Sequence, residues 1–92
     1  MNYYAVFLPM KHKEKSAVHR QAHLDFITEQ REAGHIFLFG KLADDKGGLL
    51  IYQGENKDAV DAIAKEDPYV KLGARHYEIN EWFMQTDYTF TK

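Results

Sequence analysis

The first apolar run of this sequence, Tyr3 to Leu8, constrains the fold more than any other segment. Its aromatic and branched residues suit a pleated strand, and Pro9 ends the strand because proline cannot donate to a sheet ladder. Both faces of the predicted strand are apolar, with Tyr3, Ala5 and Phe7 on one face and Tyr4, Val6 and Leu8 on the other. A strand of this kind expects cover on both sides, so a layer must lie against each face of its sheet.

The next segments predict a long helix followed by a β-hairpin. No proline or glycine interrupts Ser16–Ala33, where Ser16 suits an N-cap and Gly34 suits a helix stop. Two apolar runs, Ile36–Leu42 and Leu49–Gln53, then flank a turn that is rich in aspartate and glycine. This pattern is typical of two antiparallel strands joined by a short connection.

A second helix and a last strand complete the predicted elements. The helix is expected over Lys57–Lys65, with Asn56 as its cap. It must stop before Pro68, because proline disfavours helical geometry in the residue that precedes it. The strand is expected over His76–Met84, and a polar and aromatic tail, Gln85–Lys92, follows without a predicted structure.

The order of these elements predicts an α+β fold of the ferredoxin-like βαββαβ kind. Right-handed crossovers place both helices on one face of an antiparallel four-stranded sheet. The opposite sheet face would then be bare, although its residues are apolar. A face-to-face homodimer would cover that face and form a dimeric α+β barrel. At 92 residues the chain is expected to be one domain, residues 1–92, with 85–92 as a C-terminal tail.

Composition excludes several classes of function. The absence of cysteine rules out disulfides, thiolate nucleophiles and Cys-based metal sites. The net charge is −2 and no basic stripe is present, so nucleic-acid binding is not expected. His19 and His23 have a spacing that a metal could use, but no third ligand accompanies them, so neither a metal nor another cofactor is expected. No signal peptide and no apolar run near ~20 residues is visible, which predicts a cytoplasmic protein away from the membrane.

Two groups of residues could carry chemistry. Arg20 and His23 are three positions apart on the predicted helix and so lie on neighbouring parts of one face. Histidine moves protons near neutral pH, and arginine can hold an anionic oxygen by a forked contact. Asp67 precedes Pro68, and its carboxylate could orient a histidine. From spacing alone, a solvated surface pair and an ordinary helix-ending turn are the favoured readings of these two groups.

The same residues resemble a known family. The similarity extends over Tyr3–Phe83 and rests on Arg20–Phe26, Gly34, Gly40, the turn glycines, Asp67–Val70, Gly73 and Trp82-Phe83. These residues are similar to the YCII-related (YciI-like) family of the dimeric α+β barrel superfamily. The resemblance implies a homodimer with a small cleft between helix and sheet, in which His23 and Asp67 are an active-site pair and Arg20 belongs to the same motif.

Two functions from different classes are open at this point, and the resemblance bears on the first of them. Related barrels carry out proton-transfer, elimination and oxygen chemistry on small cyclic or aromatic molecules, often without a cofactor. The chain would then be a lyase or isomerase in which His23 is the general base or acid, Asp67 orients it and Arg20 stabilises negative charge. The alternative is a non-catalytic dimeric module that binds a small ligand. A buried His23–Asp67 contact inside a cleft would favour the enzyme.

Overall fold

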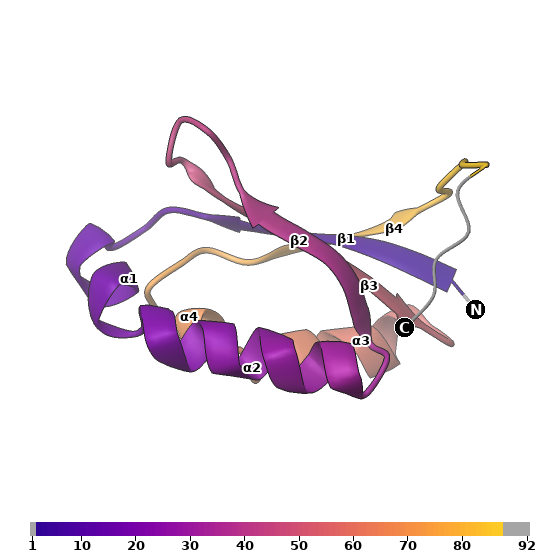
Figure 1. The fold of residues 1–92 in the computed structure, drawn as a ribbon, viewed down its shortest axis with the longest axis horizontal. Coiled ribbons are helices and arrows are strands. Elements are labelled where there is room, and N and C mark those ends of the chain that lie inside the picture. Colours follow the sequence, from indigo (N-terminus) through magenta and orange to yellow (C-terminus); the bar gives the residue numbers. More distant parts are fainter. Residues whose placement is uncertain (1, 88–92) are drawn as a thin grey trace.

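One antiparallel sheet with the strand order β2-β3-β1-β4 organises the computed structural model, which describes residues 2–87 (Figure 1). The strands are β1 (Asn2–Pro9), β2 (Ile36–Lys41), β3 (Gly47–Gly54) and β4 (Glu78–Trp82). The helices are α1 (Lys13–Val18), α2 (Arg20–Glu32), α3 (Lys57–Ala64) and α4 (Pro68–Lys71). This arrangement confirms the predicted α+β fold with a four-stranded antiparallel sheet.

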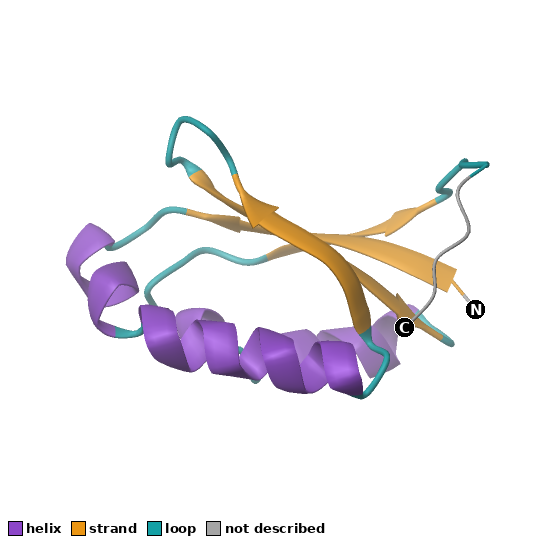
Figure 2. Cartoon of the chain, viewed as in Figure 1, coloured by secondary structure: helices purple, strands orange, loops and turns teal. Residues whose placement is uncertain are grey.

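The helices lie on one side of the sheet, and no helix of residues 2–87 lies on the opposite side (Figure 2). Alternate residues of the central strands point toward the helices and are buried, among them Tyr4 and Val6 of β1 and their partners Tyr52 and Leu50 of β3. Val60, on α3, packs against this layer. The core is therefore a single layer between sheet and helices, and most of the large buried side chains come from the two central strands.

The prediction of one continuous helix over Ser16–Ala33 is wrong at its N-terminal end. The helix is divided into α1 and α2 at His19, whose backbone (φ −97°, ψ 8°) leaves helical geometry. Ser16 is not an N-cap but a buried residue inside α1, where its hydroxyl lies 3.3 Å from the carbonyl oxygen of Ala74 and accepts a hydrogen bond from Arg75. Long-range contacts of this kind leave no local signal. The predicted stop is present, since Gly34 takes a left-handed φ of 86° just beyond α2.

The second half of the chain also differs in detail. Asn56 caps α3 as predicted, with its side chain accepting a hydrogen bond from the Ala59 amide at 2.9 Å. The short helix α4 was not predicted; it begins at Pro68, whose fixed φ suits the first helical position. The last strand is shorter than His76–Met84, because β4 pairs only with Tyr3–Phe7 of β1. Of the predicted tail, residues 85–87 belong to no helix or strand, and 88–92 lie outside the described residues.

Candidate functional site

A histidine and an aspartate from two different helices meet beneath the sheet. His23 lies in the second turn of α2, and Asp67 immediately precedes α4. The Nδ1 atom of His23 is 2.7 Å from Oδ1 and 2.9 Å from Oδ2 of Asp67. Both residues are buried, His23 to 9% exposure and Asp67 to 1%. The structure therefore brings together two of the three predicted site residues, although 44 positions separate them in the sequence.

The carboxylate of Asp67 is held in place by its own backbone surroundings. Its Oδ1 accepts a hydrogen bond from the Tyr69 amide at 2.9 Å, which makes Asp67 the N-cap of α4. Pro68 occupies the first helical position and restricts the turn. The residue that contacts the imidazole is thus oriented before any ligand arrives.

The contact with Asp67 determines which nitrogen of His23 is available. A carboxylate can only accept hydrogen bonds, so Nδ1–H is the donor in this contact, and in the neutral imidazole Nε2 then carries the lone pair. Within residues 2–87, Nε2 has no hydrogen-bond partner, and no buried side-chain nitrogen or oxygen lacks one. Nε2 is therefore reachable by solvent. A neutral imidazole held in this tautomer can accept a proton from a ligand.

Tyr69 packs directly on the imidazole. The ring centroids of His23 and Tyr69 are 3.9 Å apart and their planes differ by 13°. The guanidinium carbon of Arg75 lies 4.4 Å from the centroid of the Tyr69 ring, a cation–π contact. Arg75 is itself anchored, since Nε donates to Ser16 Oγ at 2.9 Å and Nη1 donates to the Leu8 carbonyl at 3.3 Å. The imidazole therefore belongs to a larger cluster than the predicted pair.

Arg20, the third predicted residue, begins α2 and is exposed. It makes no hydrogen bond to His23 or Asp67 in the described part of the chain. Its charge nevertheless acts on the cluster. Burial raises the pKa of the Tyr69 phenol, the charges of Arg75 and Arg20 lower it, and the Asp67 carboxylate raises it, with a net upward shift. Tyr69 is therefore a protonated hydrogen-bond donor at neutral pH.

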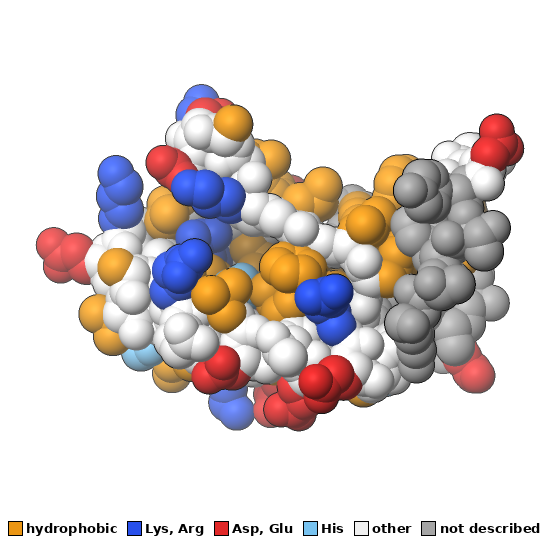
Figure 3. Space-filling model, viewed as in Figure 1, with side chains coloured by type: hydrophobic (Ala, Val, Ile, Leu, Met, Phe, Trp, Pro, Cys, Tyr) orange, Lys and Arg blue, Asp and Glu red, His pale blue; other side chains and the backbone are white. Residues whose placement is uncertain are grey.

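The face of the molecule shown in Figure 3 carries both acidic and basic side chains, and its basic side chains are grouped. Lysine and arginine side chains gather around a hollow between the β2–β3 hairpin and α2, and its floor is apolar (Figure 3). Across residues 2–87, no three His, Cys, Asp or Glu side chains are grouped closely enough to hold a metal ion.

Comparison with known proteins identifies the family. The model of the YCII-related domain matches residues 1–83. The chain belongs to the YCII-related family. Among curated proteins, none matches the chain in sequence.

One solved structure has a fold similar to that of this YCII chain. It is that of 5-chloro-2-hydroxyhydroquinone dehydrochlorinase (TftG) from Burkholderia phenoliruptrix AC1100, in complex with 2,5-dihydroxybenzoquinone. The similarity has a TM-score of 0.73 and covers 87% of this chain and 92% of that one. The sequences are 20% identical, so the likeness establishes a shared fold. No helix within residues 2–87 of this YCII chain is long and apolar enough to cross a bilayer.

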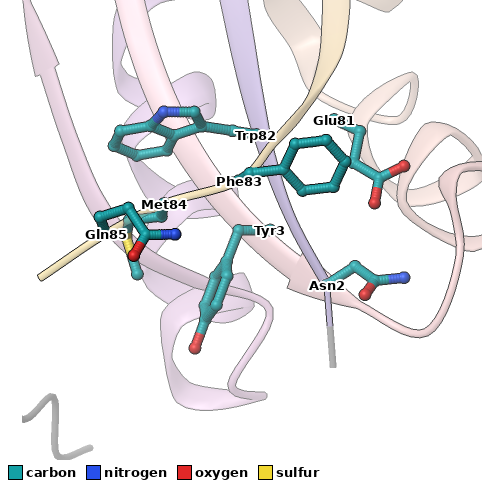
Figure 4. A pocket seen from close by; sticks show the side chains of 7 residues that line it. All are labelled: Asn2, Tyr3, Glu81, Trp82, Phe83, Met84 and Gln85. Atoms are coloured by element: carbon teal, nitrogen blue, oxygen red, sulfur yellow. The ribbon is translucent and has the colours of Figure 1, made fainter.

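A second concave region lies elsewhere on the YCII domain, with a volume of about 220 Å³ (Figure 4). It is formed by the start of β1 and the segment from Glu81 to Gln85, and it includes Tyr3, Trp82 and Phe83. None of the residues of the His23 cluster lines it. Unlike this region, the His23 cluster joins oriented polar groups.

Sequence reasoning missed part of the site. Tyr69 was visible as the third residue of Asp-Pro-Tyr, and its place two positions after the Asp67 cap was the available signal. Arg75 and Ser16 gave no signal, because their contact joins residues 59 positions apart. Their inclusion follows only from the packing of α1 against the segment that leads from α4 to β4.

Proposed function

We propose that the chain is a cofactor-independent enzyme, a lyase or isomerase that moves a proton on a small cyclic or aromatic compound. The observation that supports this most is the buried, two-point contact of Asp67 with His23 Nδ1, which leaves Nε2 open to a ligand. A carboxylate that fixes the tautomer of an imidazole is the arrangement found in general-base catalysis. A surface histidine without a partner would have favoured a binding module instead.

In the proposed reaction, Nε2 of His23 takes a proton from a hydroxyl or C–H group of the ring compound. The electron pair of that bond moves into the ring and places negative charge on a ring oxygen. In an elimination, this pair then forms a new double bond while the carbon–chlorine bond breaks, and chloride leaves with the electrons of that bond; in an isomerisation, the imidazolium returns the proton to another atom. Asp67 stabilises the imidazolium, and Arg20, whose charge acts on Tyr69, supplies positive charge near the site.

The likeness to TftG suggests which compounds to test first. That protein is named for the removal of HCl from 5-chloro-2-hydroxyhydroquinone, and its structure holds a dihydroxybenzoquinone. Both are small oxygenated rings, the substrate class that the His23 site would accept. We therefore propose hydroxylated and chlorinated single-ring compounds as the substrate class of this chain.

The first test is turnover of 5-chloro-2-hydroxyhydroquinone and its relatives. We expect the wild-type chain to release chloride from a chlorinated member of this class, or to exchange a ring hydrogen of an unchlorinated one for solvent deuterium. His23→Ala is expected to lower the rate by about 10²- to 10⁴-fold, the usual contribution of a general base. Chloride assay and proton NMR in deuterated buffer are the two measurements.

The matched control is another helix-associated histidine. The Nδ1 atom of His35 is 2.7 Å from Oε1 of Gln30, outside the site, so His35→Ala should keep wild-type turnover. If no compound of the series shows chloride release or His23-dependent exchange, the proposed enzyme is refuted. Tight binding of the same compounds without turnover would then favour the binding module.

We also propose that the chain functions as a homodimer through the uncovered sheet face. The strand register places Tyr3, Ala5 and Phe7 on this face with Leu49 and Ile51. The same face extends to Leu38 of β2 and Trp82 of β4. Leu38, Leu49 and Trp82 are 43%, 40% and 42% exposed in the single chain. The β1, β2 and β3 part of this face is largely apolar, and on a domain this small it is the kind of surface that a second copy covers.

The solution mass of the wild-type chain tests this dimer. Sedimentation equilibrium at micromolar concentration should give twice the chain mass of 10.8 kDa. We expect a dimer because packing two such faces together removes large apolar side chains from water. A stable species of 10.8 kDa at these concentrations would contradict the proposal.

A further inference from the structure

Tyr69 and Arg75, which extend the His23 cluster, each carry one polar atom that is unused by the protein itself. The Tyr69 hydroxyl forms no hydrogen bond in the described part of the chain, and neither does Nη2 of Arg75. Because no buried side-chain nitrogen or oxygen of residues 2–87 lacks a partner, both atoms are accessible to solvent. Together with Nε2 of His23, they leave one base and two hydrogen-bond donors free in the same cluster.

Arg75 is fixed in a way that a solvated arginine is not. Nε donates a hydrogen bond to Ser16 Oγ, and Nη1 donates one to the Leu8 carbonyl. The guanidinium carbon lies 4.4 Å from the centroid of the Tyr69 ring. Ser16 is buried in α1, so the anchor is itself held by packing. The remaining amino group is therefore oriented before a ligand binds, which lowers the entropic cost of holding an anion.

Tyr69 supplies a donor that stays protonated. Its ring is stacked on the imidazole of His23, with centroids 3.9 Å apart, and only 5% of the residue is exposed. Burial holds the pKa of its phenol above the ordinary value despite two nearby arginines. Tyr69 therefore brings a protonated phenolic O–H into the cluster that contains the imidazole.

We propose that Tyr69 and Arg75 form the anion-binding half of the His23 site, and that its ligand is a planar ring carrying an ionised oxygen. This inference rests on the proposed function, because it assumes that the ligand sits against Nε2 of His23. The hydroxyl of Tyr69 and Nη2 of Arg75 donate to the ring oxygen. When His23 removes a proton, the charge that develops on that oxygen lies between a phenol and a guanidinium.

The test compares the binding of 4-nitrophenolate with that of 4-nitroanisole, a neutral ring of nearly the same shape. We expect the wild-type dimer or monomer, whichever exists in solution, to bind the anion more tightly than the ether. Tyr69→Phe and Arg75→Gln should each weaken binding of the anion about tenfold or more, because each removes a hydrogen bond to a charged group. Binding of the ether should change little in both variants.

Two matched controls separate this effect from general loss of a tyrosine or an arginine. The Tyr77 hydroxyl donates to Asp61 at 2.6 Å, away from His23, so Tyr77→Phe should bind the anion as the wild type does. Arg31 lies 5.4 Å from the ring centroid of Phe39, and Arg31→Gln should likewise leave anion binding unchanged. Circular dichroism verifies the fold of each variant. If Arg75→Gln does not fold, Tyr69→Phe decides alone, since it removes one oxygen and keeps the stacked ring.

The outcomes distinguish this inference from the proposed function. Equal affinity for both rings, no detectable binding of either, or anion binding that survives both Tyr69→Phe and Arg75→Gln would overturn the anion-binding role. His23→Ala should retain the preference for the anion, because the imidazole is assigned to proton transfer. If His23→Ala abolishes turnover while Tyr69→Phe leaves anion binding unchanged, the proposed enzyme function is supported. Only the anion-binding role of Tyr69 and Arg75 is then refuted.

Discussion

Replacement of Asp67 by asparagine is expected to lower turnover by about 10²- to 10⁴-fold while the fold is kept. The carboxylate accepts one hydrogen bond from the Tyr69 backbone N–H at Oδ1 and another from Nδ1–H of His23. In Asp67→Asn, the side-chain oxygen still has to accept the hydrogen bond from the Tyr69 backbone N–H. The NH₂ group then faces Nδ1 of His23 and forces that atom to accept.

The reversed hydrogen bond explains the size of the effect. If Nδ1 accepts, the imidazole proton moves to Nε2, and the atom that should take a proton from the substrate already has one. The imidazolium formed during catalysis also loses its negative partner. The cap on α4 survives, because asparagine is as good an N-cap as aspartate. Activity should therefore fall far more than stability.

Turnover per folded molecule and the thermal midpoint, measured side by side, check this prediction. Asp25→Asn is the matched control, since Asp25 accepts a hydrogen bond from Gln21 at 2.9 Å on the exposed face of α2. It should resemble the wild type in both measurements. An Asp67→Asn variant that melts earlier but turns over substrate normally would show that the pair is structural.

Replacement of Leu49 by lysine is expected to convert the proposed dimer to monomers. Leu49 pairs with Phe7 and Gly40 on the uncovered sheet face. It is 40% exposed in the single chain, so a lysine there is tolerated by the monomer. In a face-to-face dimer, the same ammonium group would be buried without a partner, which costs several kcal/mol. Dimer affinity should fall by about 100-fold or more.

Concentration-dependent sedimentation measures this change. Val18→Lys is the control, because Val18 on α1 is 76% exposed and lies away from the sheet. It should dimerise as the wild type does, and both variants should keep the circular dichroism of the folded chain. A Leu49→Lys chain that dimerises with unchanged affinity would place any interface elsewhere on the molecule.

The backbone plan of this protein was readable from local patterns. The apolar run of β1, the glycine-rich hairpin and the Asn56 cap each depend on residues close in sequence, and the structure contains them all. The errors arose where distant contacts override local preference. Ser16 was read as an N-cap but is tied to Ala74 and Arg75, and the helix begins earlier and breaks at His19.

The residues of the candidate site also fall into those that the sequence indicates and those that only tertiary contacts reveal. Arg20, His23 and Asp67 could be named from residue type and spacing, together with the family resemblance. Sequence alone determined the order of the elements and the apolar character of both sheet faces, because side-chain periodicity is a local property. Only the tertiary structure decided that Asp67 meets Nδ1 of His23, and that Tyr69 and Arg75 join them. Those contacts depend on how α2 and α4 pack beneath one sheet, and no spacing within a single helix encodes them.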